Sequence, residues 1–295
     1  MIKVIFSDMD GTLLDESGKL PAGFDEVAAE LERRSVLFAP ASGRQYYSLI
    51  ESFPKYVNRF LFLAENGTTV CYKGEHIYES LMEDAVVHEV LAAADGIPHC
   101  FSVFCGRAYG YILEKNCDAY FLKNLRKYYR RTMRTPRFSE VQDRAVKLSF
   151  FDDEGRAEER IYPKLKPFSD RLQVVLASKE WVDVTNKDAS KGTAIAEMQR
   201  KFGVTPKECA AFGDYMNDAE MMQAVYYSYA MENAYPAVKK LARFSAPSNA
   251  AKRSLPPVVT VRSIRLNSDC GPNISKSNEN GWCASMYLLP VPNTL

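Results

Sequence analysis

The chain has 295 residues, of which 46% are hydrophobic and 25% charged, as in an ordinary globular protein long enough for two domains. Its formal net charge of +1 predicts no global field that would collect nucleic acid or an anionic membrane. No apolar run approaches the roughly 18 residues of a membrane span. We therefore expect a soluble protein whose partners are small molecules.

The cysteines show neither a pairing motif nor a metal-binding motif. None of them stands in a Cys-x-x-Cys pair, and the strand-like start of the chain has no cleavable signal pattern. We expect reduced thiols and a cytoplasmic location, whereas the oligomeric state cannot be read from the sequence. The seven cysteines are Cys71, Cys100, Cys105, Cys117, Cys209, Cys270 and Cys283.

The first predicted element is an apolar strand, Val4–Ser7, that runs directly into Asp8, Asp10 and Gly11. In open α/β sheets, ligands sit just beyond the carboxyl ends of such strands. Two neighbouring acids repel each other unless a cation lies between them or one is protonated. A carboxylate here could attack phosphorus while Mg²⁺ neutralises the approaching anions. Taken alone, the segment leaves a simple side-chain-capped turn as an alternative.

The next elements predict a parallel β-α-β unit. An amphipathic helix is expected over Phe24–Arg34, followed by a strand over Val36–Ala39 and another over Leu61–Ala64. Beyond the second strand, the Ser42 hydroxyl and the backbone N–H of Gly43 could hold phosphate oxygens, or simply form a turn.

The middle of the chain is predicted to be an inserted α/β domain at 81–185, because the polar segments fall on either side of it. A helix is expected at Asp84–Ala94, and the basic run Lys123–Arg137 is interpreted as a solvated helix face, since nearby acids cancel its charge. Such a domain suits a lid that excludes water. Its strand candidates are Phe101–Phe104, Tyr109–Leu113, Lys147–Phe151 and Leu172–Leu176.

Two further segments bring polar groups to the same region. Lys191 opens a helix that Gly203 ends, and a cation at the positive end of a helix dipole is unfavourable unless an anion binds close by. The strand Ala210–Phe212 leads into Asp214 and Asp218, whose spacing places both near one metal. A solvated lysine and two helix-capping acids are the alternatives for each segment taken singly.

In their order along the chain, these segments resemble the haloacid dehalogenase superfamily of phosphotransferases, in its Cof-type sugar-phosphatase-like branch with a large α/β cap. The resemblance covers roughly residues 1–249. It implies a Rossmann-like parallel-sheet core formed by residues 1–80 and 186–295, with a cap at 81–185. The matching motifs are Asp8–Thr12, Ser42–Arg44, Glu65–Gly67, Lys191–Gly192, Gly213–Asp218 and Met231–Ala234.

The resemblance also implies a role for each matching residue. Asp8 would be the nucleophile that forms an aspartyl-phosphate, and Asp10 the general acid and base. Mg²⁺ would be bound by Asp8, by Asp214 and by the backbone carbonyl of Asp10, with Asp218 in support. Thr12 would also steady Asp10 and its loop. The residues implied in phosphate binding are Met9, Thr12, Ser42, Gly43, Lys191 and Asn217.

The function predicted is that of a Mg²⁺-dependent phosphatase acting on a small phosphomonoester, either a sugar phosphate or a phosphorylated cofactor. A phosphomutase and a non-catalytic phospho-ligand-binding protein on the same scaffold are the alternatives. Residues 250–295 depart from the family pattern, because they carry Pro256, Pro257 and many Asn and Ser residues with little helical period. A divergent extension, a disordered tail and an altered reading frame all remain open for this segment.

Overall fold

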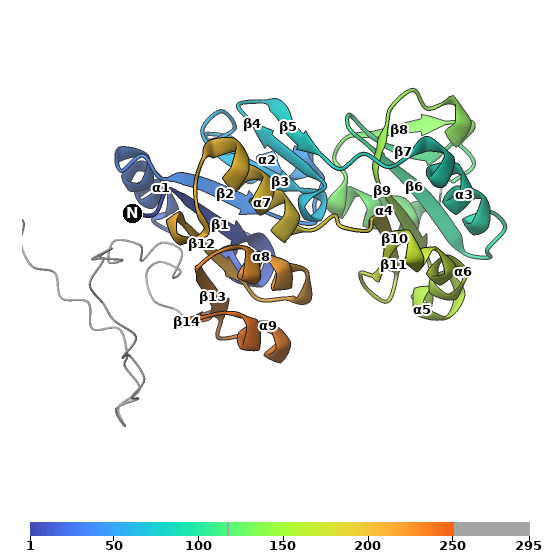
Figure 1. Ribbon diagram of the computed structural model, residues 1–295. Coiled ribbons are helices and arrows are strands. Elements are labelled where there is room, and N and C mark those ends of the chain that lie inside the picture. The colour runs from blue at the N-terminus through green and yellow to red at the C-terminus, as the bar shows by residue number, and fades with distance from the viewer. Residues whose placement is uncertain (117, 251–295) are drawn as a thin grey trace, which may run out of the picture.

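The computed structural model describes residues 1–116 and 118–250, so the atypical segment expected at 250–295 lies outside the described residues except for its first residue. Figure 1 shows two lobes joined by extended connections, each organised around its own β-sheet. Within the described ranges, no helix is both long enough and apolar enough to cross a membrane.

The sheet of the first lobe contains eight strands within the described residues, in the order β14-β13-β12-β1-β2-β3-β4-β5. The six from β14 to β3 pair in parallel, and β4 and β5 continue the sheet antiparallel. The strand β1 lies in the middle of the parallel part, which explains its continuous burial. The strands are β1 (Val4–Asp8), β2 (Leu37–Ala41), β3 (Leu61–Ala64), β4 (Thr69–Tyr72), β5 (Glu75–Glu79), β12 (Cys209–Gly213), β13 (Tyr227–Met231) and β14 (Phe244–Ala246).

The first helix of this lobe buries one apolar stripe. In α1 the buried residues are Phe24, Val27, Ala28 and Leu31, the spacing of one face of an α-helix. The helix α7 ends at Gly203, whose φ of 62° suits a left-handed C-terminal cap. The helices are α1 (Phe24–Arg33), α2 (Tyr46–Glu51), α7 (Lys191–Phe202), α8 (Ala219–Ala224) and α9 (Pro236–Leu241).

The second lobe has a sheet in the order β10-β11-β9-β6-β7-β8 and its own hydrophobic core. Leu148 and Phe150 of β9 belong to that core, together with residues of α3. The elements are α3 (Asp84–Ala94), β6 (Cys100–Gly106), β7 (Gly110–Leu113), α4 (Ala119–Tyr128), β8 (Thr132–Thr135), β9 (Ala145–Asp152), α5 (Ala157–Arg160), α6 (Tyr162–Leu165), β10 (Leu172–Leu176) and β11 (Trp181–Asn186).

The α/β class with a parallel-sheet core is confirmed, and several predicted elements coincide with observed ones. The strands at Leu61–Ala64 and Leu172–Leu176 and the helix at Asp84–Ala94 have the predicted bounds.

The prediction of one solvated helix face over the basic run Lys123–Arg137 is wrong. The helix α4 ends at Tyr128, and the chain then forms β8, which pairs with β7 in parallel. Strand pairing therefore overrides the helical pattern here, and Gly110 donates its N–H to the carbonyl of Arg131 next to the new strand.

Candidate active site

The site lies where neighbouring parallel strands of the first sheet end. Asp8 is the last residue of β1 and pairs in register with Ala41, the last residue of β2. Ser42 directly follows β2, and Asp214 directly follows β12 on the other side of β1. The carboxyl ends of parallel strands share one edge of the sheet, so segments far apart in sequence deliver their polar groups to one place.

Three carboxylates and one ammonium form the centre of this edge, where Asp214 is half-buried and the other groups are buried. One oxygen from each of Asp8, Asp214 and Asp218 lies within 4.8 Å of the others. The Nζ of Lys191 lies 2.5 Å from Asp8 Oδ1 and 2.7 Å from Asp218 Oδ1, and its side chain is fully buried. Three acids facing one ammonium leave an excess of negative charge, and hard oxygen ligands of this kind fit a divalent cation.

The charges in this centre shift one another's proton affinities. Burial, followed by the charge of Asp218, raises the pKa of Asp8 well above its usual value, although Lys191 opposes the shift. Burial also raises the pKa of Asp214 to about 6. For Lys191, burial opposes the charged form, but Asp218 and Asp8 outweigh it and raise its pKa above the usual value. Lys191 therefore stays a cation, and more positive charge near Asp8 and Asp214 would favour their ionised forms.

Hydrogen bonds and close packing fix the orientation of Asp214. Its Oδ1 accepts a hydrogen bond of 2.7 Å from the Thr12 hydroxyl, and its backbone N–H donates to Asp218 Oδ2 at 2.9 Å. Gly11 has a φ of +83°, and a Cβ there would lie 2.4 Å from Asp214 Oδ2. A glycine is therefore needed at position 11 both for the backbone conformation and for the approach of the carboxylate.

Asp10 lies in a different environment from Asp8, although only Met9 separates them. Its side chain is 62% exposed and lies 2.6 Å from the Nη2 of Arg44. It is not one of the three clustered acids. The Met9 side chain points the other way, into the core of the lobe.

The remaining predicted phosphate-binding residues lie around a loop with unusual backbone angles. Glu65 and Asn66 have φ values of 50° and 57°, a region that residues other than glycine rarely adopt. The Asn66 side-chain oxygen accepts a hydrogen bond of 3.0 Å from Asn217. The hydroxyl of Ser42 accepts one of 3.2 Å from the backbone of Arg44.

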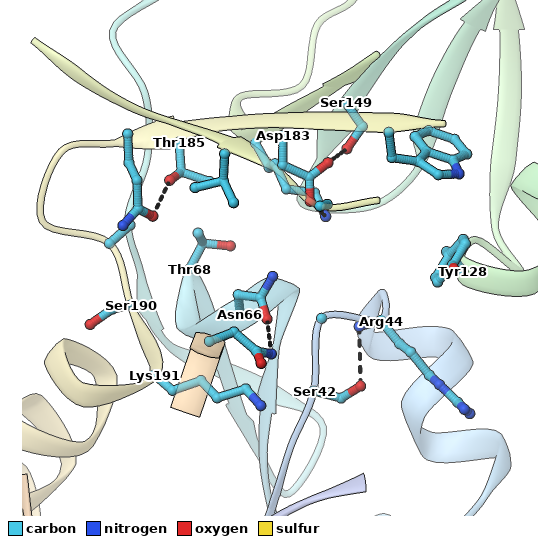
Figure 2. A pocket seen from close by; sticks show the side chains of 18 of the residues that line it. Ser42, Arg44, Asn66, Thr68, Tyr128, Ser149, Asp183, Thr185, Ser190 and Lys191 are labelled. Atoms are coloured by element: carbon cyan, nitrogen blue, oxygen red, sulfur yellow. Dashed lines mark hydrogen bonds and ion pairs between the residues drawn. The ribbon is translucent and has the colours of Figure 1, made fainter. Parts of the chain in front are cut away.

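A cavity of about 530 Å³ opens above these groups, between the two lobes. Figure 2 shows Ser42, Asn66 and Lys191 below the space, and Asp183 and Ser149 above it. The cavity size is that of small-ligand sites. Of the predicted site residues, Asp10, Ser42, Gly43, Lys191 and Asn217 line it.

The sequence analysis assigned no site role to several other lining residues, among them Arg44, Asn66 and residues of the second lobe. A signal for two of the latter was present, because polar Lys147 and Ser149 alternate with apolar Leu148 and Phe150. The alternation marks a strand with one apolar and one polar face. The cavity residues from the second lobe include Tyr128, Lys147, Ser149, Gln173, Val175, Trp181, Asp183 and Thr185.

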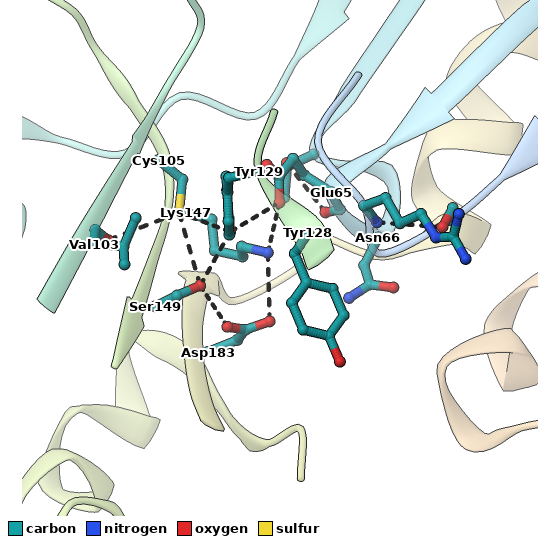
Figure 3. A network of polar contacts seen from close by, with 12 residues as sticks. Glu65, Asn66, Val103, Cys105, Tyr128, Tyr129, Lys147, Ser149 and Asp183 are labelled. Atoms are coloured by element: carbon teal, nitrogen blue, oxygen red, sulfur yellow. Dashed lines mark hydrogen bonds and ion pairs between the residues drawn. The ribbon is translucent and has the colours of Figure 1, made fainter. Parts of the chain in front are cut away.

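A buried polar network joins the two lobes beside the cavity (Figure 3). The Nζ of Lys147, on β9, lies 2.5 Å from Glu65 Oε2 of the first lobe and 3.4 Å from Asp183 Oδ2 on β11. Tyr129 donates a hydrogen bond of 3.5 Å to Glu65, and its hydroxyl lies 3.3 Å from that of Ser149. The network gives the cavity a charged roof whose position depends on both lobes.

Comparison with known proteins identifies the family of the chain. Residues 5–254 match the family described as haloacid dehalogenase-like hydrolase. A 5-amino-6-(5-phospho-D-ribitylamino)uracil phosphatase from Escherichia coli is 31% identical over 258 residues, covering 84% of this chain and 92% of that protein. An HMP-PP phosphatase from Serratia proteamaculans is 26% identical over 248 residues, covering 82% of this chain and 88% of its own.

Solved structures extend the likeness to the fold. A crystal structure from Streptococcus mutans superposes with a TM-score of 0.74 at 28% identity, covering 85% of this chain and 95% of that one. One from Thermotoga maritima reaches a TM-score of 0.77 at 23% identity, covering 92% of this chain and 99% of that one. The matched range includes every acid of the site, and the relatives named above are phosphatases. The chain therefore belongs to the haloacid dehalogenase-like hydrolases and is a Cof-type phosphatase of that family.

Proposed function

We propose that the chain is a Mg²⁺-dependent phosphatase that hydrolyses a small phosphomonoester through an aspartyl-phosphate on Asp8. The observation that carries this proposal is the contrast between Asp8 and Asp10. Asp8 is buried against Lys191, whereas Asp10 is exposed on the cavity wall beside Arg44. Two carboxylates in opposite environments suit two roles, one that attacks and one that transfers protons.

In the first half-reaction, a carboxylate oxygen of Asp8 attacks phosphorus and the bond from phosphorus to the leaving oxygen breaks. Asp10 gives its proton to that oxygen, so the alcohol departs neutral. In the second half-reaction, Asp10 takes a proton from water as the water attacks the same phosphorus. The bond to Asp8 then breaks, and inorganic phosphate and the free carboxylate are released.

The acids fit the metal that the family uses. Asp8 and Asp214, supported by Asp218 and by the backbone carbonyl of Asp10, would hold Mg²⁺. When bound, the cation supplies positive charge that offsets the repulsion between an anionic phosphate and the carboxylates. Lys191 supplies a fixed positive charge 2.5 Å from Asp8 Oδ1.

Thr12 has a narrower role in this proposal than phosphate binding. Its side chain is fully buried, and its only hydroxyl proton is donated to Asp214. We propose that it positions Asp214. Ser42, Gly43 and Asn217 line the cavity and are the proposed phosphate contacts, together with Lys191 and the N–H of Met9.

Within the same proposal, residues 81–185 form a cap over a core made of 1–80 and 186 onward. The leaving group of the substrate would occupy the cavity between them. The named relatives act on a phosphorylated ribitylaminouracil and on HMP-PP. We propose a leaving group of that size, such as a sugar or the dephosphorylated form of a small cofactor, because the cavity of about 530 Å³ accommodates one.

Release of inorganic phosphate by the full-length protein tests the proposal. A panel of sugar phosphates, nucleotides and phosphorylated cofactors is assayed with Mg²⁺ and again with excess chelator. We expect turnover that needs Mg²⁺ and that falls by at least about 10⁴-fold in Asp8→Asn. Asp95→Asn, at a side chain 79% exposed, is the matched control and should retain activity.

Inactivity of the parental protein across the whole panel would overturn the proposal, as would full activity of Asp8→Asn. An isomeric phosphate formed without free phosphate would instead support the phosphomutase alternative.

A further inference from the structure

The roof of the cavity is one face of the sheet in the second lobe. Ser149, Asp183 and Val175 lie side by side on β9, β11 and β10, because Asp183 pairs in register with both of the others. All three line the cavity. The residues that alternate with them, Val182 and Val184 among others, are buried in the core on the opposite face. Because side chains along a strand alternate between its two faces, the Asp183 carboxylate points into the cavity, above the proposed phosphate contacts.

Negative charges outnumber positive ones where this face meets Glu65 of the first lobe. Glu65 and Asp183 share the single ammonium of Lys147, and Glu65 has the shorter contact, 2.5 Å against 3.4 Å. The side chains of Lys147 and Glu65 are 4% and 5% exposed, so this pair is closed to a ligand. Asp183 is 18% exposed and is the accessible member of the three. The roof thus presents a carboxylate to the cavity, with a net charge of −1 among these residues.

The orientation of Asp183 is fixed in advance. Its Oδ1 accepts a hydrogen bond of 2.5 Å from the hydroxyl of Ser149, and its Oδ2 faces Lys147. Two polar partners on neighbouring strand β9 hold the carboxylate without using all of its lone pairs. Figure 2 shows it above the cavity, across from Asn66, and Figure 3 shows it beside Ser149 and Lys147. A carboxylate held this way can accept further hydrogen bonds but has none to donate.

Resting on the phosphatase function proposed above, we propose that Asp183 selects the leaving group by accepting a hydrogen bond from it. The preferred substrates are phosphomonoesters whose far end carries an amino group or another N–H or O–H donor and no second negative charge. Esters that carry a carboxylate or a second phosphate at that end are disfavoured, because their negative charge would meet the partly buried Asp183 carboxylate.

The size of the effect follows from the kind of bond lost. A hydrogen bond to a charged group, or the removal of a repulsion of similar strength, corresponds to about tenfold to a hundredfold in kcat/KM. The effect should appear mainly in KM, because Asp183 is placed to contact the part of the substrate that does not react.

Three related esters test the proposal on the full-length protein with Mg²⁺. Glucosamine 6-phosphate carries a cation, glucose 6-phosphate carries only hydroxyls, and 6-phosphogluconate carries a carboxylate in place of the sugar carbonyl carbon. We expect kcat/KM to fall in that order. If turnover of a sugar ester is too slow to follow, its inhibition constant against p-nitrophenyl phosphate supplies the same ranking.

In Asp183→Asn, the ratio of kcat/KM between the amino and the carboxylate ester should shrink by about tenfold to a hundredfold. Glu140→Gln removes an exposed acid of the second lobe that pairs with Arg137, and should leave the ratio unchanged. The ranking by the parental protein is independent of whether the variant folds.

Equal use of the amino and carboxylate esters by the parental protein would overturn the inference. A preference for the carboxylate ester would also overturn it. A ratio unmoved in Asp183→Asn would overturn it as well. Failure to hydrolyse any ester, p-nitrophenyl phosphate included, would instead overturn the phosphatase proposal on which this inference rests.

Discussion

Removing the buried ammonium between the lobes should strongly destabilise the protein. In Lys147→Met, Glu65 and Asp183 lose the cation that lies 2.5 Å and 3.4 Å from them. Burial opposes the charge of Lys147, but Asp183 and Glu65 outweigh it and raise its pKa well above the usual value. The parental protein therefore carries this cation throughout the neutral range, and the variant leaves two acids facing each other in a buried site.

The magnitude follows from the distances. At an effective dielectric constant of about 20, unit charges 2.5 Å apart attract by about 7 kcal/mol, and desolvation of both groups offsets much of that. Removing one partner of a buried pair costs about 3–5 kcal/mol, because the other charge is left uncompensated. For a protein of this size, that loss lowers the melting temperature by about 6–20 °C.

Thermal and urea unfolding of three variants measures the effect. Lys123→Met, at an exposed position of α4, controls for the loss of a lysine and should stay close to the parental protein. Glu65→Gln added to Lys147→Met should recover part of the loss by removing an uncompensated carboxylate. This electrostatic reasoning is refuted if Lys147→Met lowers the unfolding free energy no more than Lys123→Met does. It is also refuted if adding Glu65→Gln to Lys147→Met lowers the unfolding free energy further.

Three further predictions concern packing, thiol reactivity and pH. In Gly192→Ala the new Cβ would lie 2.6 Å from the Cβ of Glu220, so we expect overpacking to cost about 1–3 kcal/mol in urea unfolding; an unchanged midpoint would contradict this contact. Burial raises the pKa of Cys71 and that of Cys105 to about 12. Peptide mapping after iodoacetamide treatment at pH 8 should therefore show that both thiols are modified roughly a thousandfold more slowly in the folded protein than in the unfolded one. Comparable rates in the two states would contradict this prediction. The side chain of Lys3, followed by the backbone of Thr205, lowers the pKa of Glu208 from 4.5 to about 2. The stabilisation by Glu208 is therefore complete above pH 4.5 and is lost as the pH falls toward 2. The difference in unfolding free energy between the parental protein and Glu208→Gln should narrow as the pH falls from 6 to 3. A constant difference would show that the ionisation of Glu208 does not contribute to stability.

The residues at the strand ends of the first lobe could be brought together from the sequence. Asp8, Ser42 and Asp214 each follow an apolar run of strand length, and parallel strands place their carboxyl ends at one edge. Lys191 was found because a cation at the start of a helix is unfavourable without a nearby anion, and the structure supplies two such anions, Asp8 and Asp218. Local pattern and a general rule of topology were sufficient for this half of the site.

The roof of the cavity could not be predicted in the same way. The contact between Lys147 and Glu65 depends on how one lobe is placed over the other, which no local pattern specifies. The basic run was misassigned for a similar reason, because its second half pairs with β7, a partner distant in sequence. In the same stretch, Arg131 lies 4.1 Å above the ring of Tyr47 and so contacts the first lobe.

The most direct test of the central claim is chemical identification of the residue that binds phosphorus. The full-length protein is mixed with Mg²⁺ and an ester that it hydrolyses, and the reaction is quenched in acid. Borohydride then reduces any aspartyl-phosphate to homoserine. Peptide mass spectrometry then locates the change. We predict homoserine at position 8, only when ester is present. With p-nitrophenyl phosphate, whose leaving group departs without a proton, we predict more of it in Asp10→Asn, where the second half-reaction lacks its base. Phosphate release with Asp8 left unmodified, or homoserine at another aspartate, would contradict the account.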